Sequence, residues 1–169
     1  MGTSQDQHHR EVFAEWMTEH KGIVFKIVRG FTLEPSDAED LTQDIMLALW
    51  RSIPSFRGDA KPSTWIWRIA VNQAIGWKRT GGPEHSALDD LPLSSQPSAN
   101  SRADDGLAVD RIYDAVRTLT PLNRALVILA FEGHSYSEIA EITGMTETNV
   151  GARLSRARTR LSQILEVTR

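Results

Sequence analysis

The sequence predicts an all-α protein in which two small helical domains are joined by a flexible acidic linker. Every segment with a regular apolar pattern repeats at the helical period of about 3.6 residues, and none alternates as a strand does. Residues 81–106 keep no apolar period and are dominated by Pro, Gly, Ser and Asp, which is typical of a linker. We therefore expect one domain at residues 1–80 and another at 107–169, both small enough to be marginally stable.

The first domain is expected to begin with three helices. Residues 11–20 and 23–31 give two short ones. A third opens at Ser36, because Glu39 follows three residues later as in a capping box, and it ends before Pro54. Its buried face is expected to hold Leu41, Ile45, Ala48 and Leu49.

A short loop over residues 55–62 precedes a fourth helix. Ser63 or Thr64 is expected to start this helix, which runs to about Arg79. Its expected buried stripe holds Ile66, Ile69, Ala70 and Gln73. A second stripe, on another face, holds Trp65, Arg68, Asn72 and Arg79.

The second domain is also expected to contain four helices. Residues 107–119 form the first, and Pro121 follows Thr120 at the position that favours the start of the second. Residues 122–131 are apolar nearly all round, which is typical of a core helix. Ser135 and Glu138 form a capping box that opens a short third helix, and Gly144 ends it. The fourth opens at Thr146 or Glu147 and buries Val150, Leu154, Ala157, Leu161 and Leu165.

Acidic and basic residues are segregated along the chain, although the formal net charge is only −3. Residues 34–48 hold five acids and no Lys or Arg, and residues 84–114 hold seven acids against two bases. Residues 51–79 hold six bases against one acid, and residues 149–169 hold five arginines against one acid. Two basic blocks in an acidic chain indicate contact with nucleic acid at two places, although solvated helix faces would give the same pattern.

Composition excludes several classes of protein. The chain has no cysteine, which excludes a disulfide framework and any thiolate metal or redox site. No apolar run approaches the ~18 residues of a transmembrane helix, and the polar N-terminus carries no secretory core. We find no phosphate-binding loop, nucleophile elbow or zinc spacing. We therefore expect a soluble, cytoplasmic protein that is not inserted in a membrane, needs no cofactor or metal and is not an enzyme.

Residues 135–158 have the layout of a helix-turn-helix motif, whose second helix enters the major groove of DNA. Thr148, Ala152, Ser155, Arg156 and Thr159 point most nearly away from the expected buried stripe. Arg153 and Arg160 lie on one flank, and Gly151 and Arg158 lie on the other. We expect base contacts from Thr148, Asn149 and Arg156, contact with a thymine methyl group from Ala152, and phosphate contacts from Arg153, Arg158 and Arg160.

Residues 56–79 combine aromatic side chains with bases, a pattern that suits unstacked single-stranded bases. Tryptophans at helical spacing are more often part of a core, and Trp67 and Trp77 are the likeliest to be so. The candidate contacts in this segment are Phe56, Arg57, Lys61, Trp65, Arg68, Asn72, Lys78 and Arg79. The carboxylates of residues 37–44 have no histidine nearby, so a docking face for a basic partner, or plain solvated charge, fits them better than catalysis or metal binding.

These segments together resemble the bacterial extracytoplasmic-function sigma factors. The sequence DAEDLTQD at residues 37–44 resembles the polymerase-binding helix of that family. FRGD at 56–59 and STWIWRIAVN at 63–72 resemble its promoter-melting loop and the helix that follows. LTP at 119–121 and FEGHSYSEIA at 131–140 resemble the start of its fourth conserved region, and Val150 with RLSRAR at 153–158 resembles its recognition helix.

The resemblance implies two domains that bind the RNA polymerase core, mainly the clamp helices of its largest subunit. Asp40, Gln43 and Asp44 would lie on that face. The first domain would capture the minus-ten promoter element and flip one base into a pocket lined by the Phe56 loop and Asn72, which recovers the cost of flipping through stacking and edge hydrogen bonds. The second domain would read the minus-thirty-five element as duplex. An anti-sigma factor is the one further partner that the resemblance allows.

One departure from the family concerns the recognition helix. The family often has Thr-Val-Arg-Ser-Arg where this chain has NVGAR at residues 149–153, so two positions that often contact the promoter lack long side chains. Three other functions remain open on the residues alone. A stand-alone helix-turn-helix regulator would not need the first domain, and a decoy for an anti-sigma factor is suggested only by the bare positions. A hydrolase is the weakest, because no acid, base and nucleophile converge.

Overall fold

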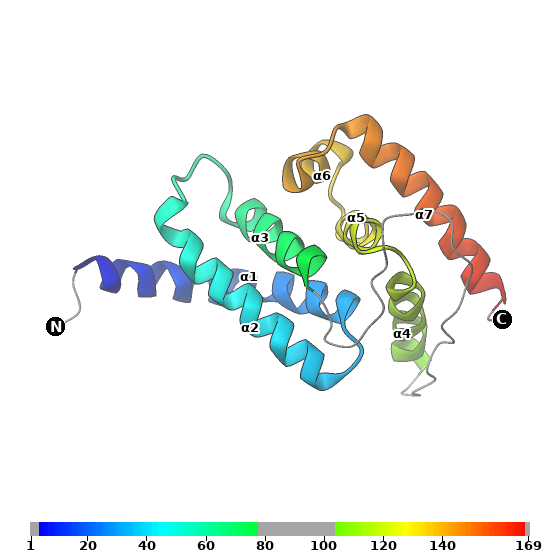
Figure 1. The fold of residues 1–169 in the computed structure, drawn as a ribbon, viewed down its shortest axis with the longest axis horizontal. Coiled ribbons are helices and arrows are strands. Elements are labelled where there is room, and N and C mark those ends of the chain that lie inside the picture. Colours follow the sequence, from blue (N-terminus) through cyan, green and yellow to red (C-terminus); the bar gives the residue numbers. More distant parts are fainter. Residues whose placement is uncertain (1–3, 78–103, 168–169) are drawn as a thin grey trace. The chain divides into compact units, whose positions relative to one another are not determined.

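The computed structural model describes residues 4–77 and 104–167, and the chain divides into two compact units, Met1–Trp77 and Lys78–Arg169 (Figure 1). All regular structure in these described ranges is helical, as the sequence predicts. Most of the predicted linker lies outside the described residues, and its last three residues belong to the first helix of the second unit. Within the described ranges, no helix combines the length and the hydropathy needed to cross a membrane.

The first unit packs three helices against one another. They are α1 (Ser4–Phe31), α2 (Pro35–Ser52) and α3 (Pro62–Gly76), with a 3-10 turn, η1 (Ile53–Ser55), after α2. Each helix contributes fully buried side chains to the shared core, among them Ile27, Leu41, Ile45, Leu49, Ile66 and Val71. The predicted end of α2 before Pro54 is confirmed.

The first helix is continuous, so the prediction of two short helices at 11–20 and 23–31 is wrong. Trp16, Ile23 and Ile27 are buried at spacings of seven and four residues, which keeps one apolar face through the supposed break. Gly22, between the two predicted helices, costs about 1 kcal/mol in a helix interior. Burial of a large apolar side chain contributes about 1.5–3 kcal/mol, so packing on α2 and α3 overrides the glycine.

Two predicted helix starts are also wrong, and both errors have the same cause. Helix α2 begins at Pro35 with Glu34 as N-cap and no side-chain capping bond, so Ser36 is inside the first turn. Helix α3 begins at Pro62, ahead of the predicted Ser63 or Thr64. Proline fits the first helical position because its fixed φ suits the helix and the N–H it lacks would have no helical partner there.

The buried face of α3 is broader than predicted and rotated from it. Ile66 and Ala70 are buried as expected, but Gln73 is exposed and Ile69 is only half-buried. Trp67, Val71 and Ala74 are buried instead. The face is broad because α3 packs against both α1 and α2, so side chains from two sides of the helix enter the core. The helix ends at Gly76, earlier than the predicted end near Arg79.

The second unit places one short apolar helix among three others. Its helices are α4 (Asp104–Arg117), α5 (Pro121–Phe131), α6 (Tyr136–Thr143) and α7 (Glu147–Val167). Residues 125–129 of α5 are buried on consecutive positions, which confirms that it is the core helix. The long α7 packs on all three others and contributes Val150, Leu154, Ala157 and Leu161. Leu165, also predicted to be buried, is half-buried.

Local capping fixes the geometry of α6 and α7. The Ser135 hydroxyl accepts from the Glu138 backbone N–H at 3.2 Å, and the Glu138 carboxylate accepts from the Ser135 N–H at 2.8 Å, so the predicted capping box is confirmed. Gly144 ends α6 with φ of 74°, a left-handed conformation that favours glycine. Thr146 then accepts from the Asn149 N–H at 3.2 Å, and α7 starts at Glu147.

The turn between α4 and α5 is stabilised by a buried arginine. Pro121 starts α5 as predicted, but the Thr120 side chain makes no capping hydrogen bond. The Arg124 guanidinium instead donates to the backbone carbonyl of Arg117 at 2.6 Å and to that of Leu119 at 3.0 Å. Burial, together with repulsion from Arg117, lowers the pKa of Arg124 to about 10. Arg124 therefore remains charged at neutral pH and satisfies carbonyls that the end of α4 leaves open.

Candidate functional site

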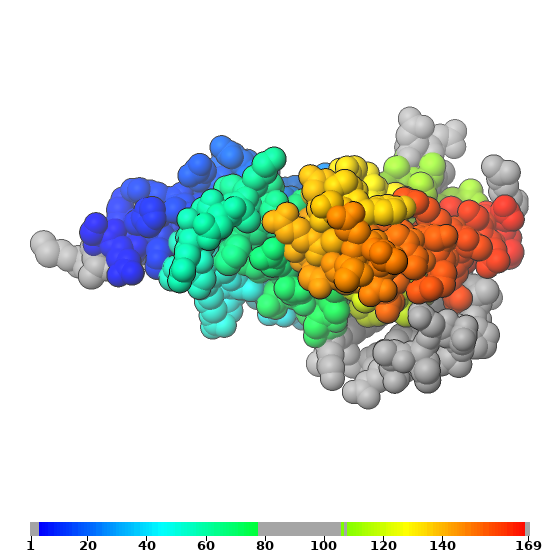
Figure 2. Space-filling model, turned by 90° about the horizontal axis from the view of Figure 1, so that it is seen from above, coloured from blue at the N-terminus to red at the C-terminus, as the bar shows by residue number. Residues whose placement is uncertain are grey.

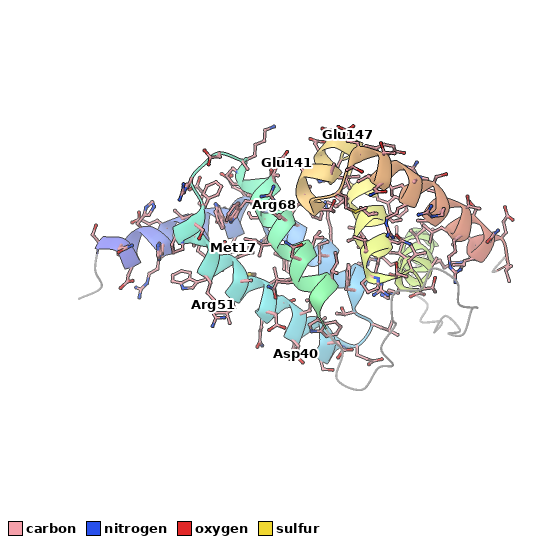
Figure 3. The ribbon with its side chains drawn as sticks, turned by 45° about the horizontal axis from the view of Figure 1, so that its top comes forward. Met17, Asp40, Arg51, Arg68, Glu141 and Glu147 are labelled. Atoms are coloured by element: carbon pink, nitrogen blue, oxygen red, sulfur yellow. The ribbon has the colours of Figure 1, made fainter. Side chains whose placement is uncertain are left out.

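A stripe of exposed side chains runs along the outer face of α2. It consists of Asp40, Gln43, Asp44, Leu47 and Arg51, and we refer to it as the α2 stripe. Spacings of three and four residues align these positions on one side of the helix. Figure 3 labels Asp40 towards the start of α2 and Arg51 towards its end; they are separated by about 16 Å at the helical rise of about 1.5 Å per residue.

The opposite side of α2 is anchored in the core. Leu41, Ile45 and Leu49 have no measurable exposure, so the rotation of the helix is fixed and the α2 stripe is held towards solvent. Leu47 is 46% exposed despite its large apolar side chain. Sequence reasoning selected the acidic end of this stripe but missed Leu47 and Arg51. The signal was present, because positions 40, 44, 47 and 51 follow the spacing of one helix face.

The candidate minus-ten segment contains an aromatic cluster. The ring centroid of Phe56 lies 5.3 Å from that of Trp16 and 5.6 Å from that of Trp65, in edge-on and tilted arrangements. The Trp65 indole N–H donates to the Ser52 hydroxyl at 3.0 Å. Phe56 and Trp65 are half-buried, so each has one side in the unit and another towards solvent. Such an arrangement offers rigid apolar surface without a fully free ring.

Polar residues surround this cluster. Gly58 turns the loop with φ of 80°, and Arg57 and Lys61 on either side of it are exposed. On α3, Arg68, labelled in Figure 3, is half-buried, and Asn72 one turn later is exposed. Their spacing puts both on the helix face that also carries Trp65, as the sequence predicts. Trp67 is buried, which confirms its place in the core, Trp77 is half-buried, and the remaining candidates Lys78 and Arg79 lie outside the described residues.

The outer face of α7 carries the exposed residues that the sequence predicts. Thr148, Asn149, Ala152, Ser155, Arg156 and Thr159 are all exposed, opposite the buried Val150, Leu154, Ala157 and Leu161. In the space-filling view of Figure 2, α7 (orange to red) lies uncovered along much of that view. The exposed face therefore belongs to the second helix of a capped helix-turn-helix pair, the position that enters the major groove in such motifs.

The flanking arginines of α7 are partly engaged within the unit. The Arg153 guanidinium donates to the Asn123 side chain on α5 at 3.4 Å. On the other flank, the Arg158 guanidinium donates to the Tyr136 hydroxyl on α6 at 3.2 Å. Arg160 is half-buried. These contacts leave each guanidinium with further N–H donors, because arginine has five. Sequence reasoning missed Tyr136, whose partner on α7 is separated by 22 residues in the chain.

The acidic and histidine side chains of the described residues form no metal-binding cluster. No group of three or more His, Asp or Glu side chains is arranged there to hold a metal ion. The acidic residues of α2 instead spread along one helix face. The α2 stripe, the aromatic cluster and the outer face of α7 are three surfaces with side chains open to solvent, and such surfaces are suited to contact with other macromolecules.

Comparisons with known proteins give one family match for each of the two units. The model of sigma-70 region 2 matches residues 16–82, and the model of sigma-70 region 4 matches residues 110–161. The ECF RNA polymerase sigma factor SigM of Mycobacterium tuberculosis is 30% identical over 92% of this chain and 78% of its own length. The RNA polymerase sigma factor NccH of Alcaligenes xylosoxydans xylosoxydans is 26% identical over 95% of this chain and 90% of its own.

Two solved structures share the fold. CnrH, solved in complex with the cytosolic domain of CnrY, matches with a TM-score of 0.66 at 22% identity and covers 94% of this chain and 90% of its own. The sigma factor RpoE of Bartonella quintana, solved in complex with the anti-sigma factor NepR, matches with a TM-score of 0.66 at 24% identity and covers 95% of this chain and 99% of its own.

Proposed function

This chain belongs to the extracytoplasmic-function (ECF) family of bacterial sigma factors, the subunits that direct RNA polymerase to promoters, and we propose that its two units divide that work. The first unit binds the polymerase core and the minus-ten element. The second unit reads the minus-thirty-five element. The chain acts in the cytoplasm as a non-catalytic subunit, with the polymerase supplying the chemistry.

The α2 stripe is the observation that carries the proposal. Its exposed acids, amide and leucine lie on a helix whose other face is completely buried, so they contribute nothing to the core of the unit. Asp40 and Asp44 suit basic groups on the clamp helices of the largest polymerase subunit, and such complementary charge speeds association. Leu47 supplies an apolar contact near the middle of the stripe, where burial adds affinity.

The aromatic cluster and Asn72 support a role in promoter opening. A flipped base of the non-template strand costs a few kcal/mol to extract from the duplex. The outward sides of Phe56 and Trp65 supply stacking surface, and the Asn72 amide supplies one donor group and one acceptor to a base edge. Arg57, Lys61, Arg68, Lys78 and Arg79 hold the backbone of the opened strand.

The outer face of α7 reads duplex DNA in this proposal. Thr148, Asn149 and Arg156 contact base edges, Ala152 contacts a thymine methyl group, and Arg153, Arg158 and Arg160 contact phosphates. A stand-alone helix-turn-helix regulator is disfavoured, because the sigma-70 region 2 match, from residue 16, covers most of a unit that such a regulator does not use. RpoE, of the same fold, was solved with an anti-sigma factor, and we infer that a comparable protein regulates this chain.

Transcription by reconstituted holoenzyme tests the proposal. The chain is mixed with core polymerase and a library of randomised promoter duplexes, and the transcripts are sequenced. We expect starts at a fixed distance downstream of two enriched elements, and no enrichment with core polymerase alone. The free chain should bind duplex weakly, because it is net acidic and its units are small. Tight sequence-specific binding by the free chain, without transcripts, would instead establish a stand-alone regulator.

A further inference from the structure

Gly151 leaves a space on one flank of the recognition helix that a neighbouring ring fills. A Cβ atom at this position would lie 3.3 Å from Cε2 of Tyr136 and 3.6 Å from its Cδ2. The first distance is closer than ordinary van der Waals contact, so even an alanine here would press on the ring. Glycine is otherwise among the least favourable residues for a helix interior. Its presence in α7 therefore allows α6 to place Tyr136 directly against the recognition helix.

Tyr136 in turn engages Arg158. The Arg158 guanidinium donates to the Tyr136 hydroxyl at 3.2 Å. Arg158 follows Gly151 by seven residues, which is about two helical turns, so the glycine and the arginine share one flank of α7. Tyr136 is 40% exposed and Arg158 is also exposed, so the contact lies at the surface. The three residues form a small cluster in which the glycine admits the ring and the ring orients the arginine.

The Tyr136–Arg158 pair offers more hydrogen-bond donors than acceptors to a ligand. Because the Tyr136 hydroxyl accepts from Arg158, its own hydrogen points elsewhere and is available to donate. Arg158 keeps four further N–H donors and a full positive charge. The cluster therefore presents mainly hydrogen-bond donors and a positive charge to solvent. A phosphate of the DNA backbone matches this chemistry, because it has several acceptor oxygens, a negative charge and no donor.

We propose that Tyr136 and Arg158 together bind one phosphate of the DNA backbone beside the minus-thirty-five element, and that Gly151 is the residue that permits this pair to form. The proposal rests on the function proposed above for the second unit. It also explains why position 151 of the recognition helix lacks a side chain. A long side chain at position 151 would extend towards the groove and displace Tyr136. Glycine gives up any promoter contact from that side chain, and the Tyr136–Arg158 pair supplies a phosphate contact on the flank of α7 instead.

Tyr136→Phe is the main test, because it removes one hydroxyl and keeps the ring against Gly151. The probe is a labelled duplex carrying the minus-thirty-five element that wild-type holoenzyme enriches from a randomised pool, together with duplexes altered at single base pairs. We expect holoenzyme that contains Tyr136→Phe to bind every duplex about tenfold more weakly than wild-type holoenzyme. A loss of this size is typical when a hydrogen bond to a charged group, here the phosphate, is removed. The dependence of affinity on salt should not change, because tyrosine is neutral. Tyr113→Phe, the same change at the only other tyrosine, is the matched control and should bind as wild type does.

Arg158→Ala should also weaken binding to every duplex, but should lower the salt slope by about one unit. In the Arg158→Ala background, Tyr136→Phe should cost less than it does alone, because the hydroxyl has lost the group it orients. A purely structural tyrosine would give no such coupling. Gly151→Ala should keep or raise the melting temperature, since alanine favours the helix, and should nevertheless weaken duplex binding by displacing the ring.

Failure of this inference can be told from failure of the proposed function. If Tyr136→Phe or Gly151→Ala binds duplex with wild-type affinity while Arg156→Ala binds it more weakly, the proposed phosphate contact is overturned. The minus-thirty-five role of the unit would then stand. Independent, fully additive losses in Tyr136→Phe and Arg158→Ala would overturn the coupling. A holoenzyme that enriches no minus-thirty-five element, and whose binding is unaffected by Arg156→Ala, would overturn the function of the unit itself.

Discussion

Truncation of one buried leucine should strongly destabilise the second unit and leave the stability of the first unchanged. Leu154 of α7 has no measurable exposure and packs in the centre of its unit. Replacement of such a leucine by alanine costs about 2.7–5 kcal/mol, because the transfer energy and the cavity both count. A unit of about 60 residues has a free energy of unfolding of only about 3–9 kcal/mol at typical values per residue. Leu154→Ala should therefore remove at least about a third of this stability.

The distribution of aromatic residues makes the two transitions separable. All five tryptophans, at positions 16, 50, 65, 67 and 77, belong to the first unit, and both tyrosines, at 113 and 136, belong to the second. Urea unfolding followed by tryptophan fluorescence thus reports the first unit, and amide hydrogen exchange of α5 and α7 reports the second. We expect Leu154→Ala to lower protection in α5 and α7 while the tryptophan transition keeps its midpoint and slope.

The matched control is Leu41→Ala, the same truncation at a position of α2 that is equally buried. It should lower the midpoint of the tryptophan transition and leave hydrogen exchange in α7 unchanged. If Leu154→Ala lowers the tryptophan midpoint as much as Leu41→Ala does, the two units unfold as one cooperative body and not independently.

Four further substitutions test individual surfaces and contacts. Asp44→Lys should weaken binding to core polymerase in a fluorescence titration while moving stability by only about ±0.5 kcal/mol. Glu15→Lys, which reverses an exposed acidic charge on α1, should not weaken this binding. Equal affinity for both variants would remove the α2 stripe from the interface. Asn72→Ala should slow promoter opening more than it weakens duplex binding, and the loss of about 1–3 kcal/mol should depend on one base of the minus-ten element. Permanganate footprinting on single-base promoter variants measures the opening rate. If the mutant opens every variant with wild-type relative rates, Asn72 is structural. Arg156→Ala should relax preference at one or two base pairs of the minus-thirty-five element, as read from a holoenzyme binding panel, and a sequence-blind loss would contradict base reading by this side chain. Arg124→Met should lower the stability of the second unit by about 1–3 kcal/mol, because two backbone carbonyls lose their donor. Burial lowers the pKa of Arg124 to about 10 in the folded unit, so the side chain is charged in both the folded and the unfolded chain below pH 8. The effect should therefore be constant in thermal melts between pH 6 and 8, and a melt that changes within that window would point to another group.

The parts of the fold that the sequence predicted were those specified by neighbouring residues. Ser135 with Glu138, Gly144, and Pro121 each act within one helical turn, and all three mark the helix boundaries where expected. The exposed face of α7 followed from its period alone. Where two local signals competed, the pattern was misleading: Ser36 looked like a cap, but Pro35 takes the first helical position and moves the start of α2 ahead of it.

The parts that the sequence could not predict depend on contacts between distant residues. Residues 11–31 were predicted to form two short helices, and only the packing of α1 on two other helices shows why they form one. The Gly151–Tyr136 contact and the Arg158 hydrogen bond span 15 and 22 residues, beyond any local pattern. Leu47 was overlooked for another reason, because an apolar residue is assumed to be buried until the rotation of its helix is known.

The position of Phe56 between Trp16 and Trp65 has an evolutionary consequence. The loop that would capture a base rests on a side chain of α1 that never faces DNA. A substitution at Trp16 would therefore change how the loop presents its aromatic surface, and selection on promoter opening would also act on a buried residue of α1. Loop and bundle must then diverge together, so exchange of the loop between relatives should succeed only when the residue beneath it is exchanged as well.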